Sequence, residues 1–167
     1  MQGRTTKEEC FLNQAEECAK RGTCQRRNYG AVLVDKEGAV VSTGYSGAPK
    51  GQTHCSEYGE CWRDKNKIPS GGNYNKCRSV HAEMNALLQA GKEARGSTIY
   101  ISGIDVKSGE IVAAHPCFLC SKMLVNAGVE RIVIRIPGDE ALSLDPVESF
   151  KKIEEKELGK LVPVVAG

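Results

Sequence analysis

Apolar positions in residues 5–21 recur with the spacing of a helix that has one buried face. Phe11, Ala15, Cys18 and Ala19 share that face, and a threonine stands at the N-cap position. Two β-rich runs follow at 30–35 and 39–45, and the Lys-Glu-Gly sequence between them predicts a hairpin. The first part of the chain therefore predicts a helix and then two paired strands.

Beyond residue 80 the pattern alternates between helices and strands. The predicted helices are 81–91 and 117–127, and the predicted strands are 97–102 and 131–136. A charged helix at 145–158, expected to be solvated, and a strand at 161–165 complete the chain. This alternation after an opening hairpin predicts an α/β domain with a mixed sheet.

Residues 46–79 break the pattern, because they are Gly-rich and polar and contain three cysteines. A structureless loop of this length inside a small domain needs something to hold it together.

Composition narrows the class of protein. The chain of 167 residues predicts one domain over 1–167, and its formal net charge of +2 does not favour nucleic-acid binding. No apolar run approaches the roughly 20 residues that span a membrane, and the polar N-terminus is unlike a secretory signal. We therefore expect a cytoplasmic protein without a membrane partner.

Eight cysteines are unusual for a reducing compartment, where they more often bind metal, catalyse or lie in the core. Cys117 and Cys120 would project from one face of a helix whose first turn suits Pro116. His81 can supply a third ligand from the start of the other helix. Three ligands leave one tetrahedral position of Zn²⁺ open for water, as in catalytic zinc sites.

Glu83 follows the histidine by two residues, where a carboxylate can exchange protons with such a water. Individually, His81 and Glu83 could be ordinary residues of a helix start, and Cys117 and Cys120 a redox or buried pair. Together they form the His-x-Glu and Pro-Cys-x-x-Cys signature of zinc deaminases, which favours the metal site.

Three segments resemble the cytidine/deoxycytidylate deaminase superfamily, and most closely its deoxycytidylate (dCMP) branch. They are GAVLVDKEGAVVSTGYSGAPKG (30–51), CRSVHAEMNALLQAG (77–91) and PCFLCSKMLVNAGVERIVI (116–134). The resemblance covers about residues 20–136, and 137–167 are less similar. It implies a three-layer α/β/α fold with a mixed five-stranded sheet, and zinc-dependent deamination of a cytosine nucleotide, dCMP to dUMP.

The resemblance also implies substrate contacts. The backbone N–H of Ala82 would bond the pyrimidine carbonyl, and the carbonyl of His115 would orient the departing ammonia. Ser46 takes the place of a sugar-contacting Asn. Arg26 belongs to a group of basic residues, with Arg27 and Arg78, that could meet a phosphate.

The resemblance further implies a second, structural zinc, whose ligand positions match Cys24 and Cys55, with Cys61 and Cys77 the available remaining thiols. Four thiolates would fill all four coordination positions of such a zinc ion and hold the loop at about 46–79 in place. His54 is a competing ligand, and free thiols or a disulfide are the alternatives. Cys10 receives no role.

Other functions stay open at this point. The substrate could be another nucleobase, a nucleoside or adenosine in tRNA, although 5% aromatic residues disfavour an RNA substrate. A non-catalytic zinc-binding module would have no use for Glu83. The family implies a homo-oligomer, with a hexamer plausible, and dCTP and dTTP as effectors.

Overall fold

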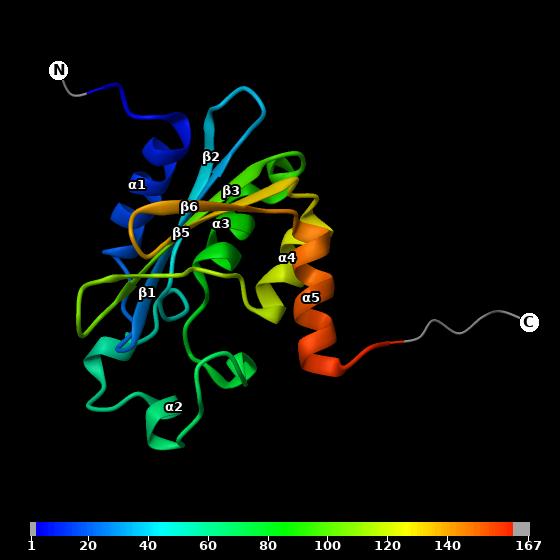
Figure 1. Ribbon diagram of the computed structural model, residues 1–167. Coiled ribbons are helices and arrows are strands. Elements are labelled where there is room, and N and C mark those ends of the chain that lie inside the picture. The colour runs from blue at the N-terminus through cyan, green and yellow to red at the C-terminus, as the bar shows by residue number, and fades with distance from the viewer. Residues whose placement is uncertain (1–2, 162–167) are drawn as a thin grey trace, which may run out of the picture.

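The computed structural model describes residues 3–161, built around one mixed sheet (Figure 1). Its strands are β1 Arg27–Val34, β2 Val40–Tyr45, β3 Thr98–Asp105, β4 Ile111–Val112, β5 Arg131–Ile136 and β6 Glu140–Leu144. The order across the sheet is β2-β1-β3-β5-β6, and β4 pairs with β3. Strands β3 and β5 run parallel, and the other pairs in the described residues are antiparallel.

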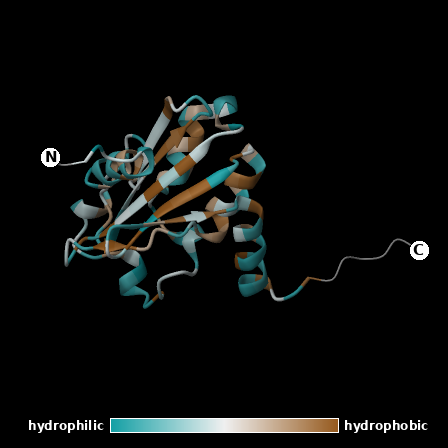
Figure 2. Ribbon diagram, turned by 45° about the horizontal axis from the view of Figure 1, so that its top comes forward, coloured by the Kyte–Doolittle hydropathy of each residue, from teal (hydrophilic) through white to brown (hydrophobic). Residues whose placement is uncertain are grey.

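Helices cover both faces of this sheet. The helices are α1 Lys7–Ala19, α2 Trp62–Lys65, α3 Ala82–Ala90, α4 Phe118–Ala127 and α5 Pro146–Leu158, with short 3-10 turns at Cys55–Glu57, Tyr74–Lys76 and Gly91–Ala94. Buried residues of α1 pack with Val32, Val34 and Val133, while α3 and α4 share a second core with Leu33 and Ile101. Hydrophobic residues accordingly concentrate along the strands (Figure 2). The expected three-layer α/β/α architecture is confirmed.

The strand count differs from the expected five. Strand β6, at the sheet edge, was missed because four of its five residues are exposed, which leaves no alternation to read. Strand β4 has two residues and was also missed. The predicted strand at 161–165 falls mostly on residues outside the described part of the chain. The described sheet thus has six strands.

The N-terminal helix agrees with its sequence prediction, since the Thr6 hydroxyl accepts a hydrogen bond from the backbone N–H of Glu9 at 3.1 Å. The C-terminal helix α5 occupies nearly its predicted range, but it is not solvated all round. Its Phe150 stacks on Phe118 of α4, with ring centroids 5.8 Å apart. No helix among residues 3–161 combines the length and the apolar character needed to cross a bilayer.

The start of α3 lies directly against β2 at Gly44. A Cβ atom on Gly44 would lie 2.2 Å from the Ala82 carbonyl oxygen and 2.6 Å from the Ala86 nitrogen. Only glycine allows the helix this close, so Gly44 helps to set the position of the first turn of α3.

Gly44→Ala is expected to destabilise the protein by about 1–3 kcal/mol, because α3 must move away from the strand. Denaturant unfolding followed by circular dichroism measures the change. Gly59→Ala is the matched control, since nothing lies within 4 Å of an added Cβ there. Equal stability of the two variants would contradict the close-approach explanation.

Candidate metal centre and active site

His81, Cys117 and Cys120 converge although up to 39 residues separate them in the chain. The Nδ1 atom of His81 lies 3.3 Å from the Cys117 sulfur and 3.3 Å from the Cys120 sulfur. The three donor atoms all lie within 4.8 Å of one another, so they could hold one metal ion. The predicted trio is therefore brought together.

Two helix starts produce this convergence. His81 is the N-cap residue of α3, and Cys117 is the N-cap residue of α4. The Cys117 sulfur accepts a hydrogen bond from the backbone N–H of Cys120 at 3.5 Å. Because α4 begins at Phe118, Pro116 precedes the cap rather than standing in the first turn as predicted. The positive ends of both helices favour negative charge on the sulfurs.

Hydrogen bonds among the three groups shift the pKa values of Cys117 and His81 strongly. A hydrogen bond from Cys120 and the neighbouring imidazole hold the pKa of Cys117 well below its usual range, although burial opposes this. Burial by itself would lower the pKa of His81, but hydrogen bonds to Cys117 and Cys77 outweigh it and raise the pKa to about 11. A divalent cation would displace such protons on binding.

Glu83 lies in the first turn of α3, and its side chain is 6% exposed. Burial raises the pKa of the Glu83 carboxyl, and the charge on His81 partly offsets that increase. The side chain lines the same cavity as His81 and Cys117. A buried carboxyl with a raised pKa, next to a metal-binding trio, is suited to accept and return a proton.

The cavity has a volume of about 360 Å³ and lies between β1, the 46–79 segment and the starts of α3 and α4. Six basic side chains line it, against two carboxylates, Glu60 and Glu83. The basic residues are Arg26, Arg27, Arg63, Lys65, Lys76 and Arg78. The charge around the cavity therefore favours an anionic ligand.

Ala82, Ser46 and His115 each lie at this cavity or beside it. Ala82 is fully buried as the first residue of α3, where a backbone N–H has no partner within the helix. Ser46 lines the cavity, but its hydroxyl accepts a hydrogen bond from the backbone N–H of Tyr29 at 2.9 Å. His115 is exposed and lines the cavity just before α4.

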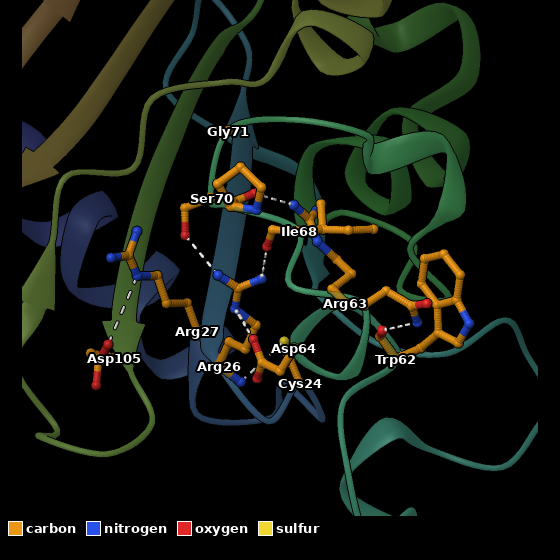
Figure 3. Close-up of polar contacts among 12 residues, drawn as sticks. Cys24, Arg26, Arg27, Trp62, Arg63, Asp64, Ile68, Ser70, Gly71 and Asp105 are labelled. Carbon is orange, nitrogen blue, oxygen red and sulfur yellow. Dashed lines mark hydrogen bonds and ion pairs between the residues drawn. The ribbon is translucent and has the colours of Figure 1, made fainter.

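Arg26 lines the cavity, but its side chain is bound by residues of the 46–79 segment, hereafter called the insertion. Its guanidinium donates to the Ser70 hydroxyl at 2.9 Å and to the Ile68 carbonyl at 3.4 Å, and it pairs with Asp64 at 3.3 Å (Figure 3). These contacts fasten the 46–79 segment to the start of β1. The Arg27 side chain is held less tightly than that of Arg26, because its ion pair with Asp105 is long, at 3.8 Å (Figure 3).

The four loop cysteines predicted to bind a second zinc, Cys24, Cys55, Cys61 and Cys77, line the same cavity. Burial and the neighbouring thiols raise the pKa of Cys55, with Arg78 opposing. Across residues 3–161, the His81 trio is the one group of three or more donors gathered within 4.8 Å. The four loop thiols thus line one cavity, but their sulfurs are not gathered as closely as the donor atoms of His81, Cys117 and Cys120.

The remaining candidates lie elsewhere. His54, the competing ligand, is exposed and is not among the residues that line the cavity. Cys10 is exposed on α1, where its sulfur accepts from the Gln14 amide at 3.5 Å. Cys18 packs beside the α1 core, as its position on the apolar face predicted.

Sequence reasoning missed two residues at the metal centre. Tyr74 places its ring against His81, and Arg63 lies over the Tyr74 ring. Both belong to the irregular 46–79 segment, where no periodicity indicates which side chains turn inward.

Comparisons with known proteins agree with this site. The family described as "Cytidine and deoxycytidylate deaminase zinc-binding region" matches residues 5–136. The deoxycytidylate deaminase of Mycobacterium phage D29 is 36% identical over 131 residues, covering 75% of this chain and 91% of that protein. That of Schizosaccharomyces pombe is 35% identical over 123 residues, covering 74% of this chain but 35% of the longer relative.

A solved structure extends the likeness to the fold. The dCMP deaminase of cyanophage S-TIM5, in complex with dCMP and dUMP, has a TM-score of 0.58 at 25% identity, covering 87% of this chain and 90% of that one. The family match spans most of the chain and includes His81, Glu83, Cys117 and Cys120. Through this zinc-binding region, the chain belongs to the cytidine and deoxycytidylate deaminase family.

Proposed function

We propose that this protein is a zinc-dependent deaminase that hydrolyses dCMP to dUMP and ammonia. The observation that carries the proposal is the convergence of His81, Cys117 and Cys120 within 4.8 Å, in a cavity that Glu83 also lines. One imidazole nitrogen and two sulfurs suit Zn²⁺, and three ligands leave a fourth position open. When bound, zinc lowers the pKa of water toward neutrality and so supplies a nucleophile.

Glu83 performs the proton transfers in this scheme. Its carboxylate takes one proton of the attacking water and delivers it to N3 of the cytosine ring. It then takes the proton of the hydroxyl that has added to C4 and delivers it to the amino group, which leaves as ammonia while the C4 carbonyl forms. Its burial keeps bulk water from competing for that proton. The backbone N–H of Ala82 is available for the pyrimidine carbonyl, and the carbonyl of His115 for the ammonia that leaves.

The basic lining of the cavity supports a nucleotide rather than a nucleoside as substrate. Arg26, Arg63 and Arg78 bond to backbone or side chains of the insertion. Lys65 and Lys76 form no ion pair with any residue in the described part of the chain, so they remain available. A phosphate would find charge partners there.

Ammonia release from cytosine, deoxycytidine, dCMP and dCTP tests this choice. The zinc-loaded chain should act on dCMP with the highest kcat/KM, and Lys65→Met with Lys76→Met should raise KM for dCMP without changing activity on deoxycytidine. Lys151→Met on α5 is the matched control, because within residues 3–161 Lys151 pairs with Glu148 alone, at the helix surface. A chain that prefers deoxycytidine, or acts on no cytosine compound, would refute the assignment.

We also propose that Cys24, Cys55, Cys61 and Cys77 bind a second, structural zinc. Support comes from their shared cavity and from nearby cations that offset thiolate charge. Although burial opposes it, hydrogen bonds from His81 and from the Ser79 backbone lower the pKa of Cys77. Burial raises the pKa of Cys55, and Arg78 opposes that increase. Such a closed site would order the 46–79 insertion.

Metal analysis of the purified chain is expected to give about two zinc ions per protomer, as two sites of this kind require. Cys61→Ser should reduce this to about one, whereas Cys10→Ser, which changes an exposed cysteine, should not. One zinc in the unsubstituted chain would eliminate the four-thiolate site. The oligomer and the dCTP and dTTP effectors stay predictions.

A further inference from the structure

Tyr74 lies between a buried arginine and the histidine of the metal centre. Its ring centroid is 5.0 Å from that of His81, and the two rings are nearly perpendicular, at 87°. The guanidinium carbon of Arg63 lies 4.4 Å from the Tyr74 ring centroid. A side chain of the insertion therefore touches a predicted metal ligand directly.

Arg63 is unusual because it is 3% exposed and forms no ion pair with a described carboxylate. Its Nη2 atom instead donates to the carbonyls of Pro69 at 2.7 Å and Gly72 at 2.6 Å. Figure 3 shows this guanidinium beside the turn that includes Ser70 and Gly71. Arg63 thereby closes the segment 63–72 on itself, directly before Tyr74.

The hydroxyl of Tyr74 is held as well. It accepts a hydrogen bond from the backbone N–H of Gly71 at 3.1 Å. The ring is thus fixed by a cation against it and by a donor at its far end. Both contacts come from the same insertion, so the position of the ring depends on that segment being folded.

His81, in contrast, receives little support from its own helix. It is the N-cap residue of α3, but its side chain makes no capping hydrogen bond. Rotation about its Cβ–Cγ bond would turn Nδ1 away from the two sulfurs that it faces at 3.3 Å. A perpendicular ring packed against the imidazole restricts that rotation.

We propose that Tyr74, held by Arg63, is a positioning residue that orients the His81 imidazole for metal binding. The insertion then contributes to the affinity of the metal centre and does not only cover the cavity. This inference rests on the zinc site of the proposed function, but it requires neither a particular substrate nor deaminase activity. Substitution of residues that hold metal ligands in place typically lowers metal affinity by about 10- to 100-fold.

The test follows the imidazole ¹⁵N signals of His81 while a chelator withdraws zinc from the full-length chain. With three histidines in the sequence, these signals are readily assigned. The Nδ1 signal reports the atom that faces Cys117 and Cys120, although the imidazole also hydrogen-bonds to Cys77. Tyr74→Leu should lose zinc about tenfold more readily and show broadened or shifted His81 signals. Tyr74→Phe keeps the ring and its contact with Arg63 but loses the hydrogen bond from Gly71, so it should lose zinc clearly less readily than Tyr74→Leu.

Trp62→Leu is the control for general damage to the insertion, because Trp62 is 45% exposed and has no contact with His81 among those described. It should retain normal zinc affinity. Arg63→Lys should weaken zinc binding less than Tyr74→Leu, and adding it to Tyr74→Leu should bring no further loss. Additive losses would mean that Arg63 acts by another route.

Two results would overturn the proposal. One is that Tyr74→Leu retains zinc at His81 as tightly as the unsubstituted chain. The other is that Tyr74→Phe loses as much zinc as Tyr74→Leu, which would assign the effect to the hydroxyl. If no variant, nor the unsubstituted chain, showed zinc at His81, the proposed function itself would fail instead.

Discussion

Replacing Glu83 with Gln is expected to lower the rate of ammonia release by about 10²- to 10⁴-fold or more, because the amide cannot carry the proton. Zinc content should not change, since Glu83 is not one of the three converging donors. The two measurements are made on the same purified sample, one for ammonia and one for metal.

Glu60→Gln is the matched control, because Glu60 is the other carboxylate that lines the cavity. It is exposed rather than buried, so its replacement should leave kcat nearly unchanged. Loss of zinc together with activity in Glu83→Gln would show that Glu83 is a ligand or a structural residue. Equal losses in both variants would point to a general charge effect.

Cys120→Ser is expected to remove zinc from the catalytic site and activity with it. Cys120 is fully buried and lies 3.3 Å from Nδ1 of His81, so its replacement leaves two of the three converging donors. Removal of a ligand should lower zinc affinity by more than the roughly 100-fold upper limit that is typical when a residue supporting a ligand is replaced. Chelator competition and ammonia release measure the two effects.

Cys18→Ser is the corresponding control, since Cys18 is a partly buried cysteine of α1 that packs against the core on that side of the sheet. That variant should keep full zinc content and activity. If Cys120→Ser retained both, the assignment of this sulfur as a ligand would be wrong, and the His81–Cys117 pair would need another partner.

The main elements could be predicted because their signals are local. Thr6 caps the start of α1 as expected, and Gly128 caps the end of α4; both roles depend only on neighbouring backbone. Edge strand β6 lacked such a signal, because its side chains are mostly exposed. The packing of Phe150 on Phe118 joins residues far apart in sequence, so the charge pattern of α5 could not reveal it.

The metal trio could be predicted for a different reason. His81 and Cys117 both stand at helix N-termini, and parallel strands β3 and β5 bring the two helices to the same end of the sheet. No such regularity predicts which side chains of the insertion turn toward the site. Engagement of Arg26 by Ser70, and the contact of Tyr74 with His81, depend on irregular backbone without periodicity.

The most direct test of the central claim is the conversion of dCMP by the purified chain before and after zinc removal. We predict dUMP and ammonia in equal amounts, loss of both products on chelation, and recovery when zinc is restored. Continued turnover by metal-free protein would contradict a mechanism centred on His81, Cys117 and Cys120. So would a zinc-replete chain with Glu83 intact that releases no ammonia from any cytosine compound.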